Sequence, residues 1–427
     1  MTCFADQDPL NFVLIKMFAF ILTTEDHQVF CESLNKTFGC ARFVWNQLVE
    51  NFNEWSPNVT PTKISSKILK DNAEFAFLNE VSAATLQQKE RDFTELKKQF
   101  FNKKRKKKLG RPKFKKKGVS KESFRLPNQK FTFNNEAGTI KLEKIGYIKV
   151  IADRVIPIDA DFRSVTVSKT STEKYFVSIL VQINVDPKLL TGKKVGIDLG
   201  LKDLFILSDG QKFNNPRPFR ENQAKLKKAQ QHLSRKVKGS KRKEKARFKV
   251  SKIHEAIANS RKDFLHKIST ELVTEYDVIC IEDLNVSGMM KNHCLSKAIQ
   301  DASWSTFVSF LDYKCNWYGK TLVKIDRFYP SSKTCSNCGH KMESMGLNIR
   351  NWTCPECGVH HDRDINAAIN ILNKGFTDLC GTELEFTGIS KKPVSVESIE
   401  YRHGEDVSLR RLEPTSTKCL ERSWSFL

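Results

Sequence analysis

Long apolar runs are missing from this sequence of 427 residues. A membrane-spanning helix needs roughly 18 or more apolar residues in succession, and the most apolar segment, residues 10–22, is interrupted by Lys16. The same segment has neither a basic start nor a small-residue cleavage site, so we interpret it as a buried strand or a poorly defined leader. We therefore expect a cytoplasmic protein without a membrane partner.

Acidic residues are scarce relative to basic ones. The 49 Asp and Glu residues stand against 72 Lys and Arg residues, which gives a formal net charge of +23. A surplus of this size attracts polyanions before any specific contact forms, so nucleic acid is the first partner to consider. A basic surface that serves solubility alone is the alternative, and the clustering of the charges argues against it.

The strongest cluster of charge is residues 103–117, where eleven of fifteen positions are Lys or Arg. Such a run is usually a solvated, mobile segment. Here Phe100, Phe101 and Phe114 lie among the charges and are able to stack on bases, which favours a loop that grips phosphates. A nuclear-localisation signal remains an alternative.

Closely spaced cysteines are few: only four of the twelve form Cys-x2-Cys pairs. The pairs are separated by fifteen residues, which is typical of a structural zinc site with four thiolate ligands. A redox dithiol and extra ligation by His360 or His361 are the alternatives. Because four thiolates complete a tetrahedron, the zinc would be structural and catalysis must lie elsewhere. The predicted zinc ligands are Cys335, Cys338, Cys354 and Cys357.

The spacing of apolar residues predicts a helical region up to about residue 93 and β structure over residues 123–185. Two short strands follow over 193–207, and then a long helical pattern over 222–275 that is interrupted near Gly239. Further along, a strand over 278–281, a helix over 303–318 and a strand over 321–325 alternate. This alternation indicates an α/β layer.

Three acidic residues lie at the edges of these predicted elements. Asp198 ends a strand before Gly200, Glu282 follows the apolar run 278–281, and Asp364 begins a helix directly after the cysteine pairs. Each acid alone is more simply a helix cap or a surface charge. Together they are the oxygen ligands that magnesium prefers, and two magnesium ions would hydrolyse a phosphodiester bond.

The residues around these acids resemble the motifs of TnpB, a transposon-encoded family related to type V CRISPR effectors. Gly196-Ile197-Asp198-Leu199-Gly200 resembles the first RuvC motif and Ile281-Glu282-Asp283-Leu284-Asn285 the second. Asp362-Arg363-Asp364-Ile365-Asn366-Ala367-Ala368 resembles the third, and the cysteine pairs lie between the second and third motifs as in that family. The resemblance covers roughly residues 20–375.

The resemblance implies an α/β RNase H-like (RuvC) core with an inserted zinc ribbon and an N-terminal α+β nucleic-acid-binding lobe, part helical and part like a β-barrel. We expect the following regions: a helical lobe 1–122 with a basic loop 97–118, a β-rich wedge-like region 123–190, a nuclease core 191–330, a zinc ribbon 331–361, a final RuvC helix 362–375 and a disordered tail 376–427. The expected catalytic acids, which would bind Mg²⁺, are Asp198, Glu282 and Asp364, with Asp362 as the alternative to Asp364.

The same resemblance implies an RNA-guided DNA endonuclease of a transposable element, guided by RNA from the transposon end and associated with the nucleoid when it is bound to target DNA. A catalytically silent RNA-guided DNA-binding protein and a DNA transposase are the alternatives. Gln87 and Gln88 are candidates for reading bases next to the target, although exposed helix glutamines are the simpler interpretation.

Overall fold

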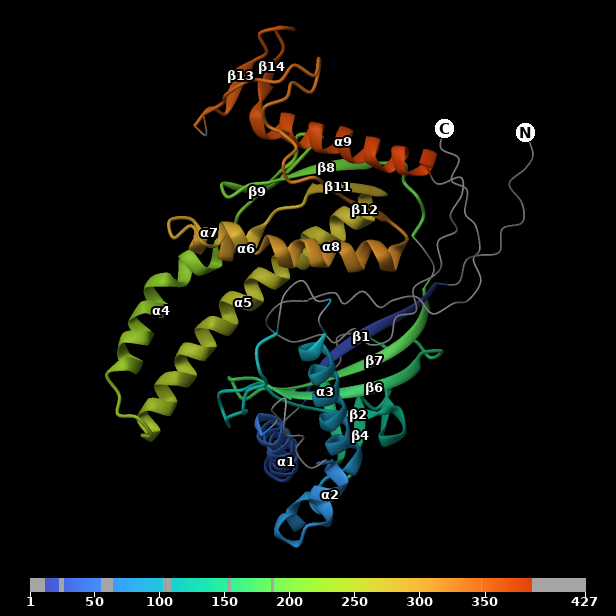
Figure 1. Cartoon of the computed structure of the whole chain (residues 1–427), viewed down its shortest axis with the longest axis vertical. Helices are drawn as coiled ribbons and strands as arrows, with labels where there is room; N and C mark the ends of the chain where they lie inside the picture. The colour runs from blue at the N-terminus through green and yellow to red at the C-terminus, as the bar shows by residue number, and fades with distance from the viewer. Residues whose placement is uncertain are drawn as a thin grey trace, which may run out of the picture. The chain divides into compact units, whose positions relative to one another are not determined.

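The computed structural model describes residues 12–22, 27–54, 64–102, 104, 109–151, 155–185, 188–346 and 348–385 (Figure 1). The chain divides into two compact units. One is Val13–Asn184 and the other is Val185–Leu427 together with Met1–Phe12. From residue 386 onward, the expected tail lies outside the described residues. In the described part, no helix is both long and apolar enough to cross a membrane.

Helices of the first unit pack around their own apolar core. The residues that face this core recur at helical spacing along the first helix, as Val44, Leu48 and Phe52 do, and all three are buried. Ser65 caps the second helix by accepting a hydrogen bond from the Ile68 N–H at 3.2 Å. These helices are α1 (His27–Asn53), α2 (Ser66–Asp71), η1 (Ala73–Glu80) and α3 (Ala83–Phe101).

The β structure of the first unit is one sheet of seven strands in the order β2-β6-β7-β1-β5-β4-β3. Residues 10–22, interpreted as a strand or a leader, contain a strand that pairs antiparallel with β5. Strands β2 and β6 alternate buried and partly exposed residues, as a sheet with one covered face requires. The strands are β1 (Phe12–Leu22), β2 (Glu122–Pro127), β3 (Phe131–Asn134), β4 (Thr139–Leu142), β5 (Gly146–Ile151), β6 (Asp161–Lys169) and β7 (Tyr175–Val185), with the short helix η2 (Asn128–Lys130) before β3.

The second unit is built on a five-stranded sheet in the order β10-β9-β8-β11-β12. The first three strands along the chain are antiparallel neighbours, whereas β11 runs parallel to both β8 and β12. The strands are β8 (Lys194–Leu199), β9 (Asp203–Leu207), β10 (Lys212–Asn214), β11 (Val278–Glu282) and β12 (Thr321–Ile325). The expected strands over 193–207, 278–281 and 321–325 are thus confirmed.

Helices connect and cover these strands (Figure 1). The expected break near Gly239 is confirmed, because Gly239 has a φ of 85° and separates two helices. The last helix continues beyond residue 375, where we expected it to end. The helices are α4 (Pro218–Ser234), α5 (Lys241–Glu275), α6 (Val286–Met289), α7 (Ser296–Ala302), α8 (Trp304–Tyr318) and α9 (Arg363–Glu385), and a two-stranded sheet, β13 (Asn351–Thr353) and β14 (His360–Asp362), precedes α9.

Strand β11 separates two apolar layers. Ile279 and Ile281 belong to the core that includes buried residues of α5, α7 and α8, whereas Val278 and Cys280 pack with Ile371 of α9. Successive side chains of a strand point to opposite faces, so a strand covered on both sides must be apolar throughout. This explains the uninterrupted run Val278-Ile279-Cys280-Ile281.

Helix α9 approaches β8 so closely that only glycine fits between them. A Cβ atom built on Gly196 would lie 2.1 Å from the carbonyl oxygen of Ala368 and 2.7 Å from the backbone nitrogen of Leu372. Gly196 therefore faces α9, and residues of β8 two positions away share that face. This close approach explains why the motif of residues 196–200 begins with glycine.

Candidate active site and metal centre

Two of the three predicted acids lie on neighbouring parallel strands. Ile281 of β11 pairs with Ile197 of β8, so Glu282 and Asp198 occupy the next position along the two strands. Gly196 and Cys280 face α9. Asp198 lies two residues after Gly196 and Glu282 two residues after Cys280, so each acid shares the face of that residue. Both carboxylates are thus directed toward the α9 side, at the carboxyl edge of the sheet.

The third predicted acid lies in the first turn of α9, and the structure separates the roles of the two competing aspartates. Asp362 caps the helix, since its Oδ1 accepts hydrogen bonds from the backbone N–H groups of Asp364 at 2.9 Å and Ile365 at 3.2 Å. Its other oxygen pairs with Lys212 Nζ at 2.7 Å. Burial opposes these interactions, but together they lower the pKa of Asp362. Burial and Glu282 raise the pKa of Asp198 most, and the charge of Asp364 adds to the rise, which favours Asp364 over Asp362 as the member of the triad.

Electrostatics couple the three carboxylates. Burial, and after it the negative charges of Glu282 and Asp364, raise the pKa of Asp198 to about 7. Burial also raises the pKa of Glu282, while a hydrogen bond from Ser331 opposes the rise. Like charges at neighbouring positions destabilise one another in the absence of a cation. The arrangement is therefore suited to binding positive charge.

The carboxylates are not drawn into direct contact in this structure. Within the described ranges, only four cysteines form a group of three or more Cys, His, Asp or Glu ligand atoms within 4.8 Å of one another. Asp364 instead receives two hydrogen bonds from the guanidinium of Arg350, at 2.9 and 3.1 Å, and Glu282 receives one from Ser331. The sequence alone assigns no role to Arg350 or Ser331, because only the folded chain brings them to the acids.

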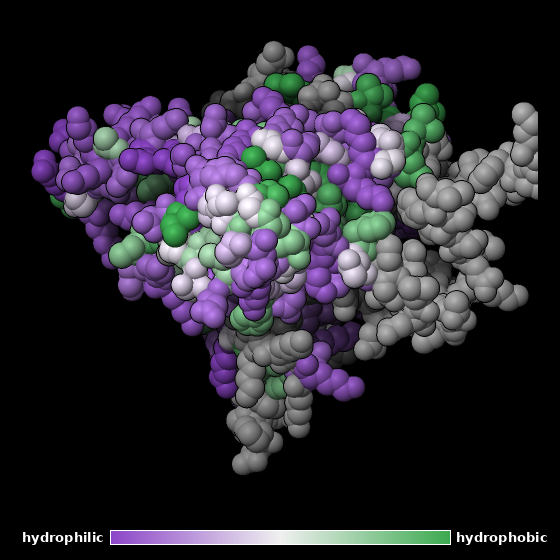
Figure 2. All heavy atoms as spheres, turned by 90° about the horizontal axis from the view of Figure 1, so that it is seen from above, coloured by the Kyte–Doolittle hydropathy of each residue, from purple (hydrophilic) through white to green (hydrophobic). Residues whose placement is uncertain are grey.

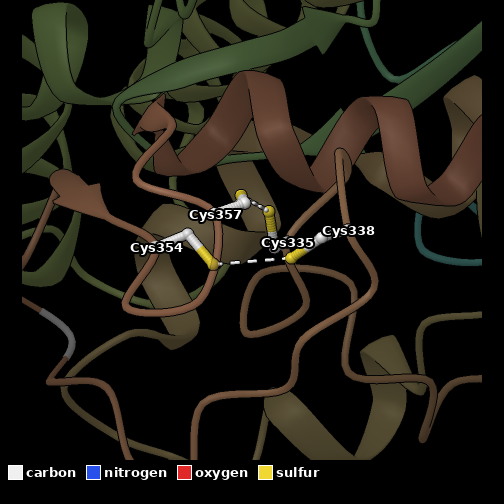
Figure 3. Close-up of side chains that lie close together, drawn as sticks. All are labelled: Cys335, Cys338, Cys354 and Cys357. Atoms are coloured by element: carbon white, nitrogen blue, oxygen red, sulfur yellow. Dashed lines mark hydrogen bonds between the residues drawn. The ribbon is translucent and has the colours of Figure 1, made fainter.

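Figure 3 shows the four predicted zinc ligands with their sulfur atoms directed toward one another. The Sγ atoms of Cys335 and Cys357 are 3.6 Å apart, and those of Cys338 and Cys354 are also 3.6 Å apart. Four sulfurs, each about 2.3 Å from a tetrahedral zinc ion, would be about 3.8 Å from one another. The spacing and the all-sulfur donor set therefore fit a tetrahedral metal ion.

Each cysteine pair is held by the same backbone turn. The N–H of Gly339 donates to the carbonyl of Cys335, and the N–H of Gly358 donates to the carbonyl of Cys354, both at 2.9 Å. Gly339 and Gly358 have φ values of 78° and 70°, in the left-handed region that favours glycine. The glycine after the second cysteine of each pair is thus required by the turn itself.

The two histidines beside the cysteines have different surroundings. His361 Nε2 lies 3.0 Å from Cys335 Sγ, and its ring centroid lies 4.8 Å from that of Trp352. His360 is exposed, and its Nδ1 lies 3.1 Å from Thr353 Oγ1. Neither histidine joins the group of mutually close ligand atoms found among the described residues. The geometry thus places His361 as a hydrogen-bonding partner of a ligand sulfur.

The two glutamines that are candidates for base reading lie on α3, in the first unit. Gln87 is exposed and lines a cavity of about 420 Å³ that is bordered by three lysines, Lys70, Lys130 and Lys144. It also borders a second cavity, of about 470 Å³. Gln88 is half-buried and lines neither of these two cavities. Of the two candidates, Gln87 is therefore the one at a concave, basic surface.

Part of the basic segment is anchored to α1 within the same unit. Asn46 donates from Nδ2 to the carbonyl of Lys115 at 3.1 Å and accepts the Lys115 N–H at 2.8 Å. Lys115 Nζ also lies 3.9 Å from the ring centroid of Trp45. Of the expected stacking residues, Phe100 and Phe101 pack against Phe52, while Phe114 is half exposed; residues 103 and 105–108 lie outside the described part.

Comparison with known proteins finds related families and a similar fold. Family models match residues 175–293 ("Probable transposase", OrfB_IS605), residues 304–371 ("Cas12f1-like, TNB domain") and residues 31–56 ("Helix-turn-helix domain"). The solved "Cryo-EM structure of the Cas12f1-sgRNA-target DNA complex" covers 84% of this chain and 99% of its own, with a TM-score of 0.51 and 15% identity. The fold is therefore of the kind seen in that effector.

Two relatives are similar over most of their length. A Streptomyces pristinaespiralis protein named "Putative RNA-guided DNA endonuclease" is 41% identical over 356 residues, which are 82% of this chain and 87% of that protein. "Putative RNA-guided DNA endonuclease InsQ" of Escherichia coli (strain K12) is 31% identical over 392 residues, 87% of this chain and 95% of that protein. The chain belongs to the TnpB family, as its motifs predicted.

Proposed function

We propose that this protein is an RNA-guided DNA endonuclease of a transposable element, and that it cuts target DNA with Asp198, Glu282 and Asp364. The observation that carries the proposal is the placement of Asp198 and Glu282 at corresponding positions of β8 and β11, where burial and then the charges of Glu282 and Asp364 raise the pKa of Asp198 to about 7. The sheet order supports an RNase H-like core: β10, β9 and β8 are antiparallel neighbours, and β11 and β12 continue the sheet beyond β8, parallel to it. The names of the relatives support a guided nuclease.

Two magnesium ions bound by the acids would activate water and stabilise the leaving oxygen of the phosphodiester. The chain's own residues prepare this site. β8 and β11 fix Asp198 and Glu282 in register, and α9 fixes Asp364. Burial keeps the carboxylates in a weakly screened environment, where they hold cations more strongly than exposed acids do. Arg350 balances the charge of Asp364 until a cation replaces it there.

We assign zinc to the four-cysteine centre and a purely structural role to that ion. All four positions of the tetrahedron are filled by thiolates, so no position remains for water or substrate. We propose a guide RNA from the transposon end and a target DNA as the partners, which the positive charge and the names of the relatives support. The α4–α5 hairpin, with thirteen Lys or Arg residues between positions 225 and 252, would contact their phosphates. Gln87, in its lysine-rimmed cavity, is the candidate for reading bases.

Replacement of Asp198 by Ala tests the proposal. Protein loaded with its co-purifying RNA should lose target cleavage in Mg²⁺ by more than roughly 100-fold, which exceeds the loss seen when residues that only orient ligands are changed. Binding of RNA and DNA should remain, since Asp198 contributes nothing to the basic surface. Cleavage is measured on a target duplex and binding by gel shift.

Asp364→Asn and Asp362→Asn form a matched pair for the same assay. The first should abolish cutting and the second should leave part of it, because Asp362 acts as a helix cap. Undiminished cleavage by Asp198→Ala would refute the assignment of the acids. A wild-type complex that binds its target in Mg²⁺ and never nicks it would instead indicate a silent RNA-guided binding protein, and direct joining of DNA ends would indicate a transposase.

A further inference from the structure

A serine hydroxyl holds the Glu282 carboxylate. Ser331 is 6% exposed, and its Oγ donates a hydrogen bond to Glu282 Oε1 at 2.5 Å. A hydroxyl group has one proton to donate, so this bond fixes one oxygen of the carboxylate in place. Ser331 lies 49 residues from Glu282 in the sequence, in the segment that leads into the first cysteine pair.

Two asparagines of α9 form hydrogen bonds with the backbone of the same segment, residues 331–336. Asn366 and Asn370 are 1% and 3% exposed and lie one helical turn apart, so they share a face. Asn370 Nδ2 donates to the carbonyl oxygens of Ser331 at 2.8 Å and Thr334 at 2.6 Å. The segment is thus tied to α9 near its start and at its centre.

Asn366 completes the attachment on both sides of Cys335. Its Nδ2 donates to the carbonyl of Thr334 at 2.7 Å, and its Oδ1 accepts the N–H of Ser336 at 2.9 Å. Cys335 lies between these two peptide groups and is itself 1% exposed. A buried amide without these partners would be left unsatisfied, so the hydrogen bonds favour keeping this segment on α9.

We infer that Ser331 is a positioning residue for Glu282, and that Asn366 and Asn370 couple the order of the four-cysteine centre to the metal affinity of the carboxylate site. The inference rests on the proposed function of the acids. A metal ion on Cys335 orders residues 331–336, the asparagines hold that segment on α9, and Ser331 then presents its hydroxyl to Glu282. The two centres share no ligand and communicate through these hydrogen bonds.

Binding of Mn²⁺ to the full-length protein without RNA tests the inference directly. Free Mn²⁺ is counted by electron paramagnetic resonance, and zinc content is measured by mass spectrometry. Ser331→Ala should weaken Mn²⁺ binding by roughly 10–100-fold, the range for residues that orient metal ligands, with unchanged zinc content. Asn370→Leu should also weaken it, although the hydroxyl is still present. Ser331→Thr, which retains a hydroxyl, should bind Mn²⁺ more tightly than Ser331→Ala.

Ser336→Ala is the matched control, because Ser336 meets Asn366 through its backbone N–H, which alanine retains. Wild-type affinity in Ser331→Ala, or equal weakening in Ser331→Thr and Ser331→Ala at full zinc content, would overturn the inference. Glu282→Gln distinguishes a failure of the proposed acid site from a failure of the inference about Ser331. If it binds Mn²⁺ as the wild type does, the proposed acid site itself is wrong. If it binds weakly while Ser331→Ala is unchanged, the acid site stands and the inference about Ser331 and the two asparagines is wrong.

Discussion

Asp198 has the most perturbed acidity of the three catalytic candidates. Its ordinary pKa of 3.8 rises to about 7 in the folded protein, first through burial and then through Glu282 and Asp364. The unfolded chain therefore releases this proton at a lower pH than the folded chain does. Between about pH 4 and pH 7 the folded state holds the extra proton, so the stabilising contribution of the protonated acid is lost as pH rises through this range.

Asp198→Asn should therefore stabilise the protein at high pH when no divalent metal is added. At pH 8 the variant should exceed the wild type by a few kcal/mol, since one pKa unit corresponds to about 1.4 kcal/mol. The difference should shrink toward zero as the pH falls to about 4 and below, because Asp198 is then increasingly protonated in both states. Thermal unfolding at the two pH values measures the effect. A difference that instead grows as the pH falls would contradict this sign.

At the scale of elements, the four-cysteine centre is built from two short turns, each closed by its own backbone hydrogen bonds. Such turns bury little apolar surface: the core of this region contains Trp352 and two of the cysteines, with three partly buried neighbours. A structure this small usually depends on its metal for stability. A metal ion bound to the four cysteines would therefore take the place of the apolar core that a short segment cannot provide.

Cys354→Ser should remove the zinc and destabilise the C-terminal unit. A loss of a few kcal/mol corresponds to roughly 5–10 °C in the unfolding temperature of a unit of this size. Cys294→Ser is the control, since Cys294 is an exposed cysteine outside the centre. Metal analysis should find one zinc per chain in the wild type and in the control. One zinc per chain in Cys354→Ser would show that the four cysteines are not the ligand set.

At the scale of the whole molecule, the α4–α5 hairpin is a second concentration of positive charge besides residues 103–117. Leu226 and Ala229 of α4 pack against Ile253 and Ile257 of α5, so the apolar residues form a seam between the helices. The lysines and arginines occupy the remaining faces of the two helices. Figure 2 shows mainly hydrophilic side chains at the left of the view, the side on which the hairpin lies in Figure 1. Within residues 225–252, Glu244 is the one acid.

Replacing four exposed cations of the hairpin with glutamine should flatten the salt dependence of RNA binding. The slope of log K against log salt should change by about 0.7 for each phosphate that the protein no longer neutralises, or by about 3 for four phosphates. Arginine at the three lysine positions retains the charge and should preserve the slope. An unchanged slope after neutralisation would show that the hairpin does not contact phosphates. The positions are Lys238, Lys241, Arg242 and Lys245.

The sequence by itself determined whatever depends on short spacing. The paired cysteines with their following glycines, the apolar run of β11 and the break at Gly239 were all predictable, because each is set by hydrogen bonds or periodicity within a few residues. The positions of the three acids at the ends of elements were predictable for the same reason. The proposal that they form one site rests on the register of β8 and β11 and on the resemblance to TnpB.

The tertiary structure alone decided which groups surround those acids. Arg350 on Asp364, Ser331 on Glu282 and the buried Asn370 that holds the Ser331 segment join parts of the chain that no local pattern relates. It also gives Asp362 a cap role and a bond to Lys212, which supports the proposal of Asp364 as the third acid. Such choices depend on distance and burial in the folded chain, and sequence spacing records neither.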